Sequence, residues 1–292
     1  MKNNFLSLLF VFLLSVVSCK KDNKEKESLD FNKGSLTILT DDSFKSIAEA
    51  LAEAYMINYP ETKINVEVKK EDLAFLDLLE DKAKMIIMSR NLSEKELAEY
   101  DKMVKLKFQP ANFAADAVAF VVPKNSERTN ISVEEIKNEL SSDNKNIIFD
   151  GTNSGNLNFV AQKFNKKPSE LKFSIINGNE NVIKELNKYP NKIGVVSLNT
   201  FSRAYSEDAQ KLREMVRILP ITENGKTYDI TPQTLRTMEY PFTRVLYFLN
   251  NEAYFGVASG FVRFACTQLG QMVVQKEGLQ PYYLFKREVQ MR

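Results

Sequence analysis

Short apolar strands alternate with amphipathic helices along most of this chain, and this alternation constrains the fold more than any other feature. Residues 35–39 (SLTIL) predict a strand, and a helix follows whose apolar face runs from Phe44 to Tyr55. Helices separate further strands that are predicted at residues 64–68, 85–88, 146–149, 173–176 and 193–198. Strands connected through helices form parallel sheets with helices on their faces, so we expect an α/β fold.

Two long extended stretches interrupt the alternation. Residues 104–124 (VKLKFQPANFAADAVAFVVPK) contain no helical pattern, and residues 240–250 (YPFTRVLYFLN) form a second extended stretch. The alternation restarts between them, so the two stretches predict two crossings between domains, with one domain inserted within the other. We therefore expect lobe I to comprise residues 34–115 and 243–292, and lobe II, the inserted lobe, to comprise residues 116–242.

The composition argues against several classes of function. The chain has 40 Lys and Arg residues against 38 Asp and Glu, a net charge of +2, so no strong overall field favours binding to nucleic acid. It has no His, which is the commonest general base and metal ligand, and its two Cys, at positions 19 and 266, are too far apart in sequence to suggest a zinc knuckle. We expect no enzyme activity, no cofactor, no metal site and no nucleic-acid partner.

The N-terminus resembles a bacterial lipoprotein signal. An apolar run from Phe5 to Val17 is too short to span a bilayer comfortably, and Cys19 follows it closely. We expect residues 1–18 to be removed as a signal peptide and Cys19 to be lipidated; the alternative is an ordinary secretory signal. Residues 19–33 then form a solvated tether. The protein would lie in the bacterial cell envelope, held to a membrane by its lipid anchor and facing the periplasm or the outer surface.

A polar loop, FDGTNSGN at residues 149–156, separates a predicted strand from a helix whose apolar face begins at Leu157. A strand that turns into a helix leaves the first helical N–H groups unpaired, and these groups favour anions. The alternative is that Asn153 or Ser154 only caps its own helix. The loop by itself is compatible with both interpretations.

Several segments resemble, in order, the PstS-type phosphate-binding proteins of bacterial ABC importers. The resemblance covers roughly residues 34–278 and rests on the segments DDSFKSIAEA, IIMSRNLS, DAVAFVVPKN, TNSGN, NKIGVVSLN, YPFTRVLYF and FVRFACTQLGQMVVQKEG. It implies a two-lobed periplasmic-binding-protein fold of type II, in which two mixed, mostly parallel sheets are joined by a two-strand hinge. It also implies phosphate or another small oxyanion as the ligand between the lobes, and an ABC permease as the partner.

By position, the resemblance places the oxyanion ligands on several segments of the chain. Ser43 and Ser154 would stand at helix N-termini, where N–H groups favour an anion, and Arg90 would add a two-pronged guanidinium group. We expect Arg90 to serve the cleft rather than the stability of the fold. The full predicted set of phosphate ligands comprises Ser43, Phe44 through its backbone, Ser89, Arg90, Asp116, Asn153, Ser154, Gly155 and Asn156.

Acidic residues depart from the family pattern at two ligand positions. Lys70, Glu71 and Asp72 stand where family members usually have a Gly-Ser-Ser loop. Asp150 stands where many members have Arg, and Asn156 replaces the usual Thr. An ionised carboxylate close to phosphate opposes its binding. Either these acids point away from the cleft, or the cleft binds a cationic or zwitterionic solute, or it binds nothing.

Ion pairs are an alternative role for the arginines. Arg90 is a candidate partner for Asp116, Glu71 or Asp72, and Arg244, on the second extended stretch, is expected to form a structural salt bridge. Two functions follow from the sequence. The first is capture of phosphate or a related oxyanion for ABC import. The alternative is a sensor or scaffold in an envelope protein complex, with an altered or empty cleft.

Overall fold

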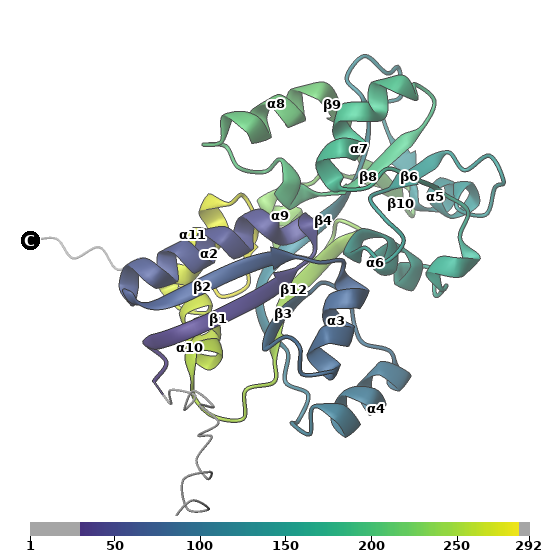
Figure 1. Cartoon of the computed structure of the whole chain (residues 1–292). Coiled ribbons are helices and arrows are strands. Elements are labelled where there is room, and N and C mark those ends of the chain that lie inside the picture. The colour runs from purple at the N-terminus through teal and green to yellow at the C-terminus, as the bar shows by residue number, and fades with distance from the viewer. Residues whose placement is uncertain (1–29, 286–292) are drawn as a thin grey trace, which may run out of the picture.

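The structure, a computed structural model, describes residues 30–285 as two α/β lobes that lie side by side (Figure 1). The predicted signal peptide, Cys19 and residues 19–29 of the predicted tether lie outside the described residues. Within residues 30–285, no helix is both long enough and apolar enough to cross a membrane.

The first lobe is built on three parallel strands, whose burial increases from the outer strand to the inner one. β1 (Lys33–Thr40) pairs with β2 (Glu61–Val68) along its whole length and with β3 (Met85–Met88) at its end. Successive side chains of a strand point to opposite faces of the sheet. Accordingly, Ile38 packs into one apolar cluster and Leu39 packs into another.

Helices cover each face of this sheet. α2 (Lys45–Asn58) and α10 (Val257–Ala265) contribute to the cluster that contains Ile38, whereas α3 (Glu71–Leu79) and α4 (Glu94–Met103) contribute to the cluster that contains Leu39. The last helix, α11 (Gln268–Lys276), packs beside α2 and α10. The sheet and its helices place the starts of α2 and α3 next to the second lobe (Figure 1).

The second lobe repeats this plan with shorter elements. β6 (Ile147–Phe149) lies between β7 (Ser174–Ile175) and β8 (Ile193–Ser197), and all three strands are parallel. The other elements of the lobe are α5 (Val133–Glu139), α6 (Gly155–Lys163), α7 (Asn179–Glu185), α8 (Glu207–Met215), α9 (Pro232–Arg236), β9 (Val216–Ile218) and a small sheet of β5 (Ile131–Ser132), β10 (Ile221–Glu223) and β11 (Lys226–Tyr228).

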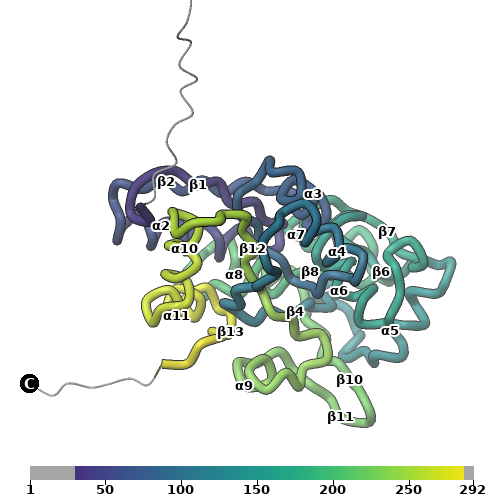
Figure 2. The backbone as a smooth tube through the Cα atoms, turned by 90° about the horizontal axis from the view of Figure 1, so that it is seen from below, coloured from purple at the N-terminus to yellow at the C-terminus, as the bar shows by residue number. Residues whose placement is uncertain are grey.

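Two strands carry the chain between the lobes. β4 (Ala111–Pro123) pairs with β12 (Thr243–Asn250) as far as Ala117 and with β8 from Val118 onward. The strand order is β2-β1-β3-β12-β4-β8-β6-β7, and β13 (Gln280–Pro281) also pairs with β4. Figure 2 shows β4 and β12 near the centre of the molecule. The pairing partner of β4 changes between Ala117 and Val118, close to the expected end of the first part of lobe I. We propose that the lobe boundaries lie between residues 115 and 116 and between residues 242 and 243.

A buried ion pair lies at this crossing. Arg244 is opposite Asp116 in the register of β12 and β4, and its Nη2 lies 2.7 Å from Oδ2 of Asp116. Both side chains are fully buried. The guanidinium group also lies 4.6 Å above the ring of Phe44 and donates to Oδ1 of Asn156 at 2.8 Å. The predicted structural salt bridge of Arg244 is therefore confirmed, and its partner is Asp116.

Candidate functional site

A single buried carboxylate lies at the starts of three helical segments. Asp41 directly follows β1 and caps η2 (Asp42–Phe44), a 3-10 turn that leads into α2. Its fully buried side chain accepts hydrogen bonds from the backbone N–H groups of Ser43 at 3.0 Å, Glu71 at 3.3 Å and Gly155 at 3.2 Å. Such N–H groups carry partial positive charge. The geometry is that of an anion site in which the anion is a side chain of the protein.

Further charged and polar groups next to Asp41 join the two lobes. Lys70 contacts Asp42 through its ammonium group, which also lies 3.0 Å from Oδ2 of Asp150. Asn179 donates to Asp42 through its backbone N–H at 2.8 Å and its side-chain amide at 2.9 Å. Asp41, Asp42 and Asp150 each have a carboxylate oxygen within 4.8 Å of the others. Lys70 supplies positive charge to this group of carboxylates.

A second buried carboxylate, that of Glu71, lies at the start of α3. Its Oε2 accepts hydrogen bonds from both the N–H and the hydroxyl group of Ser89, each at 2.7 Å. Arg90 forms ion pairs with Glu71 at 3.3 Å, with Asp72 at 2.9 Å and with Glu96 at 2.7 Å. Of the partners weighed from the sequence, Glu71 and Asp72 are confirmed for Arg90. Asp116 instead pairs with the hinge arginine described above.

The acidic departures from the family pattern point into the protein. Glu71 and Asp150 are fully buried and lie next to Gly155 and Asn179, so the alternative that these acids point away from the cleft is wrong for both. Each is balanced by a cation, Arg90 for Glu71 and Lys70 for Asp150. Asn156 adds a hydrogen bond from its side-chain amide to Oδ1 of Asp150 at 3.1 Å. The buried acids and basic groups of the cleft therefore neutralise one another within the protein.

The polar loop combines both roles that its sequence suggests. Ser154 caps α6 by accepting a hydrogen bond from the N–H of Leu157 at 3.3 Å, which confirms the capping interpretation. The next residue, Gly155, donates its own N–H to the Asp41 carboxylate. Capping and anion binding are compatible here because they use different N–H groups of the same helix start.

Other predicted ligand residues hold the walls of the cleft together. The carbonyl of Asn153 accepts a hydrogen bond from the N–H of Asp72 at 3.4 Å, and the N–H of Phe44 donates to the carbonyl three residues before it at 2.9 Å. Asp116 accepts from the hydroxyl of Ser197 at 2.9 Å as well as from the hinge arginine. These contacts fix the segments that carry the helix starts.

Sequence reasoning missed Asp41 and Asn179, and both bridge the lobes. A signal for Asp41 was available, because an Asp directly after a strand and before a helical turn is a typical N-cap, and its side chain does accept from the N–H of Ser43. Asn179 begins α7 directly after Gly178, which has a φ of 86°. No local sequence pattern indicated its contact with Asp42.

Burial has the largest influence on the pKa values of these carboxyl groups. It raises the pKa of Asp41 to about 7, with Asp150 adding to the rise and Lys70 opposing it. Burial also raises the pKa of Glu71, against the opposing charge of Arg90. A carboxyl group with a raised folded-state pKa binds more protons in the folded than in the unfolded protein. Its contribution to stability is therefore complete at low pH and is lost as the pH rises through the folded-state pKa.

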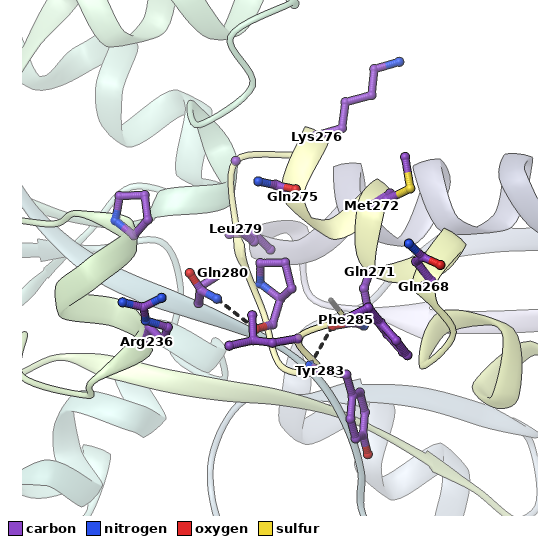
Figure 3. Close-up of a pocket in the computed structure, with 14 residues that line it drawn as sticks. Arg236, Gln268, Gln271, Met272, Gln275, Lys276, Leu279, Gln280, Tyr283 and Phe285 are labelled. Atoms are coloured by element: carbon purple, nitrogen blue, oxygen red, sulfur yellow. Dashed lines mark hydrogen bonds between the residues drawn. The ribbon is translucent and has the colours of Figure 1, made fainter. Parts of the chain in front are cut away.

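Two cavities accompany the cleft. One, of about 540 Å³, opens beside Arg90 and is lined by residues of both lobes that include Phe159 and Gln162. The other, of about 900 Å³, lies between α9, α11 and the C-terminal segment (Figure 3), with Arg236 and Lys276 on opposite sides of it. Of the predicted ligand residues, Ser89 and Arg90 line the first cavity and none lines the second. The cleft between the lobes is therefore the candidate functional site.

Comparisons with known proteins identify the family. The model of the family described as "PBP superfamily domain" matches residues 26–268. The phosphate-binding protein PstS of Borreliella burgdorferi is 22% identical over 295 residues, which cover 93% of this chain and 96% of that protein.

Solved structures show the same fold. A Clostridium perfringens protein, assigned as a phosphate ABC transporter substrate-binding protein and solved with bound phosphate, has a TM-score of 0.69 at 20% identity, over 85% of this chain and 100% of that one. An ABC-type phosphate transport receptor from Vibrio cholerae has a TM-score of 0.63 at 17% identity, over 84% of this chain and 99% of that one. These structures confirm the two-lobed periplasmic-binding-protein fold, and the match to PstS of Borreliella burgdorferi confirms the resemblance to PstS-type proteins.

The ion pairs of Arg90 indicate a contribution to stability, in contrast to the expectation from the sequence. The side chain of Arg90 is only 9% exposed and that of Glu71 is fully buried. We predict that Arg90→Met lowers the free energy of unfolding by about 3–5 kcal/mol, because it leaves the Glu71 carboxylate buried without its cation. Urea denaturation of the purified protein measures this loss.

Two further variants control for the general effect of removing a charge. Arg128→Met breaks the more exposed pair between Arg128 and Glu135 and should cost less than about 1 kcal/mol. Adding Glu71→Gln to Arg90→Met should recover part of the loss, since the uncompensated charge disappears. A loss for Arg90→Met no larger than that of Arg128→Met would contradict the prediction.

Proposed function

Because the chain belongs to the PBP superfamily domain family, we propose that it captures phosphate or a related oxyanion between its lobes and delivers it to an ABC importer. It is a solute-binding protein and not an enzyme. The relatives that are named for phosphate binding or phosphate transport, one of them solved with bound phosphate, support this choice of ligand and an ABC permease as the partner.

The observation that carries the proposal is the convergence of three backbone N–H groups on the Asp41 carboxylate. Phosphate oxygens accept hydrogen bonds from the same kind of donor, and helix N-termini are common phosphate sites. In the proposed complex, Ser43, Glu71 and Gly155 donate their N–H groups to the oxyanion, and Ser89 turns its hydroxyl toward the oxyanion from its present acceptor, the Glu71 carboxylate. The other predicted ligand residues hold the segments that carry these donors in place. They are Phe44, Arg90, Asp116, Asn153, Ser154 and Asn156.

A sensor or scaffold is the second candidate function. The ion pairs and hydrogen bonds between the lobes favour it, because Lys70 with Asp150 and Asp42 with Asn179 link the lobes through side chains of the protein. In a cleft closed in this way, contacts within the protein keep the lobes together without a bound solute, as a scaffold requires. Measured binding of phosphate separates the two candidates.

We also propose that Cys19 carries the lipid anchor. Cys19→Ala is expected to move the protein from the membrane to the soluble envelope fraction, because the acyl chains supply its membrane affinity. Cell fractionation followed by immunoblotting measures this shift, and mass spectrometry of the wild-type protein identifies its N-terminus. An intact, unmodified N-terminus on protein purified from the envelope would contradict the proposal.

Phosphate is expected to stabilise the full-length protein purified in detergent. With a dissociation constant of about 1 μM, about 1 mM phosphate adds roughly 4 kcal/mol to the free energy of unfolding. For a chain of this size that raises the Tm by about 8 °C or more. Competition from the buried carboxylates makes the shift smaller, and it should grow as the pH falls and these groups lose their charge.

Sulfate at the same ionic strength is the control, because it matches phosphate in shape. The measurements are thermal unfolding and titration calorimetry between about pH 5 and 8, a range that includes the raised pKa of Asp41, about 7. No phosphate shift beyond that of sulfate, together with no heat of binding, would favour the scaffold.

A further inference from the structure

We propose that Asp41 is a built-in ligand of the cleft: an oxyanion reaches the N–H groups of Ser43, Glu71 and Gly155 only by displacing the Asp41 carboxylate. This inference rests on the proposed function, because it names the residue that sets how tightly that same site holds its anion. Asp41 thus determines the affinity of the site by competing with the oxyanion, although it does not contact the bound oxyanion as a ligand residue.

The Asp41 carboxylate uses all three of these donors. Its Oδ1 accepts from Ser43, and its Oδ2 accepts from Glu71 and Gly155. Each backbone N–H has a single proton to donate, so an incoming oxyanion must take over the same bonds. The bonds from Glu71 and Gly155, at 3.3 and 3.2 Å, are long for N–H donors. They are therefore weaker than the bond from Ser43, at 3.0 Å, and easier for an oxyanion to replace.

The surrounding charges make the exclusion stronger. Asp42 and Asp150 act on Asp41 with like charge, Lys70 acts with opposite charge, and Glu71 contacts it through its N–H. An oxyanion beside an ionised Asp41 meets repulsion that little water screens, because the site is buried. Proton uptake by Asp41, whose pKa burial raises to about 7, removes this repulsion. Competition is therefore strongest above neutral pH and weakest in mildly acidic solution.

Asp41 also links the lobes as a bound ligand would. Its hydrogen bond to Gly155 connects the end of β1 in lobe I with the start of α6 in lobe II. A Cβ atom on Gly155 would lie 2.8 Å from Oγ of Ser89 and 3.2 Å from Oε2 of Glu71. The absence of a side chain there lets the two lobes approach this closely. Two-lobed proteins close by a hinge around their ligands, and here a side chain of lobe I makes that contact.

Two substitutions in the full-length protein test this inference. Asp41→Asn keeps the size of the side chain and one acceptor oxygen but replaces the other oxygen with a donor. Asp41→Ser keeps a capping acceptor on a shorter side chain, in case the first variant folds poorly. Asp143→Asn is the matched control, because it removes one negative charge from a side chain that is 90% exposed and pairs with Lys172.

Calorimetry with inorganic phosphate is the first measurement. At about pH 8, where the wild-type Asp41 is ionised, both Asp41 variants should bind phosphate at least about tenfold more tightly than the wild type and Asp143→Asn. The gain should shrink at about pH 5.5, because the wild-type carboxyl group is then protonated. Equal or weaker binding by both variants, when the wild type binds phosphate, overturns the inference.

Hydrogen exchange at the N–H of Gly155, measured with no phosphate present, gives a readout that does not depend on the ligand. Asp41→Ser should exchange at least about tenfold faster than the wild type and the control, because its shorter side chain leaves this N–H without its acceptor. Unchanged exchange overturns the inference. Faster exchange without phosphate binding by any of the proteins supports Asp41 as a built-in ligand and contradicts phosphate capture, so the two failures are distinguishable.

Discussion

A carboxylate that is removed from water has to be met by hydrogen-bond donors, and the cleft of this protein is arranged around that requirement. Asp41 takes the N–H groups of three helix starts, and the neighbouring charges occur in pairs, Lys70 with Asp150 and Arg90 with Glu71. Removal of one partner from a buried pair leaves an uncompensated charge. The lobes are therefore held together by charges that belong to the protein, at the position where the proposed function requires an anion.

The regular elements of the fold could be predicted from the sequence because their signals are local. The predicted helix face from Phe44 to Tyr55 coincides with the start and core of α2 (Lys45–Asn58). The first extended stretch, predicted over residues 104–124, is shorter in the structure. β4 begins only at Ala111, and Lys105, with a φ of 58°, turns the chain before it. The strands of the small sheet in lobe II have two or three residues each, too few to show an alternation of apolar and polar positions.

The segments of the candidate site could be predicted, but the pairing of their side chains could not. Lys70 and Asp150 are 80 residues apart in sequence, and Asp41 and Gly155 are 114 residues apart, so only the folded chain brings them together. The resemblance to PstS-type proteins predicts Ser43 as a ligand and assigns no role to Asp41, two residues before it. In the sequence, an acid next to a residue expected to bind an anion argues against anion binding. In the structure, the carboxylate of this acid accepts the hydrogen bonds of the anion-binding N–H groups itself.

Helix N–H groups bind the Asp41 carboxylate in the folded protein. The most direct measurement is an NMR titration, between about pH 4 and 9, of the Asp41 carboxyl carbon together with the N–H of Gly155. We predict that the carboxyl group titrates with a pKa of about 7 and that the Gly155 signal moves with the same midpoint. A Gly155 signal that does not respond to the ionisation of the Asp41 carboxyl group would contradict this binding.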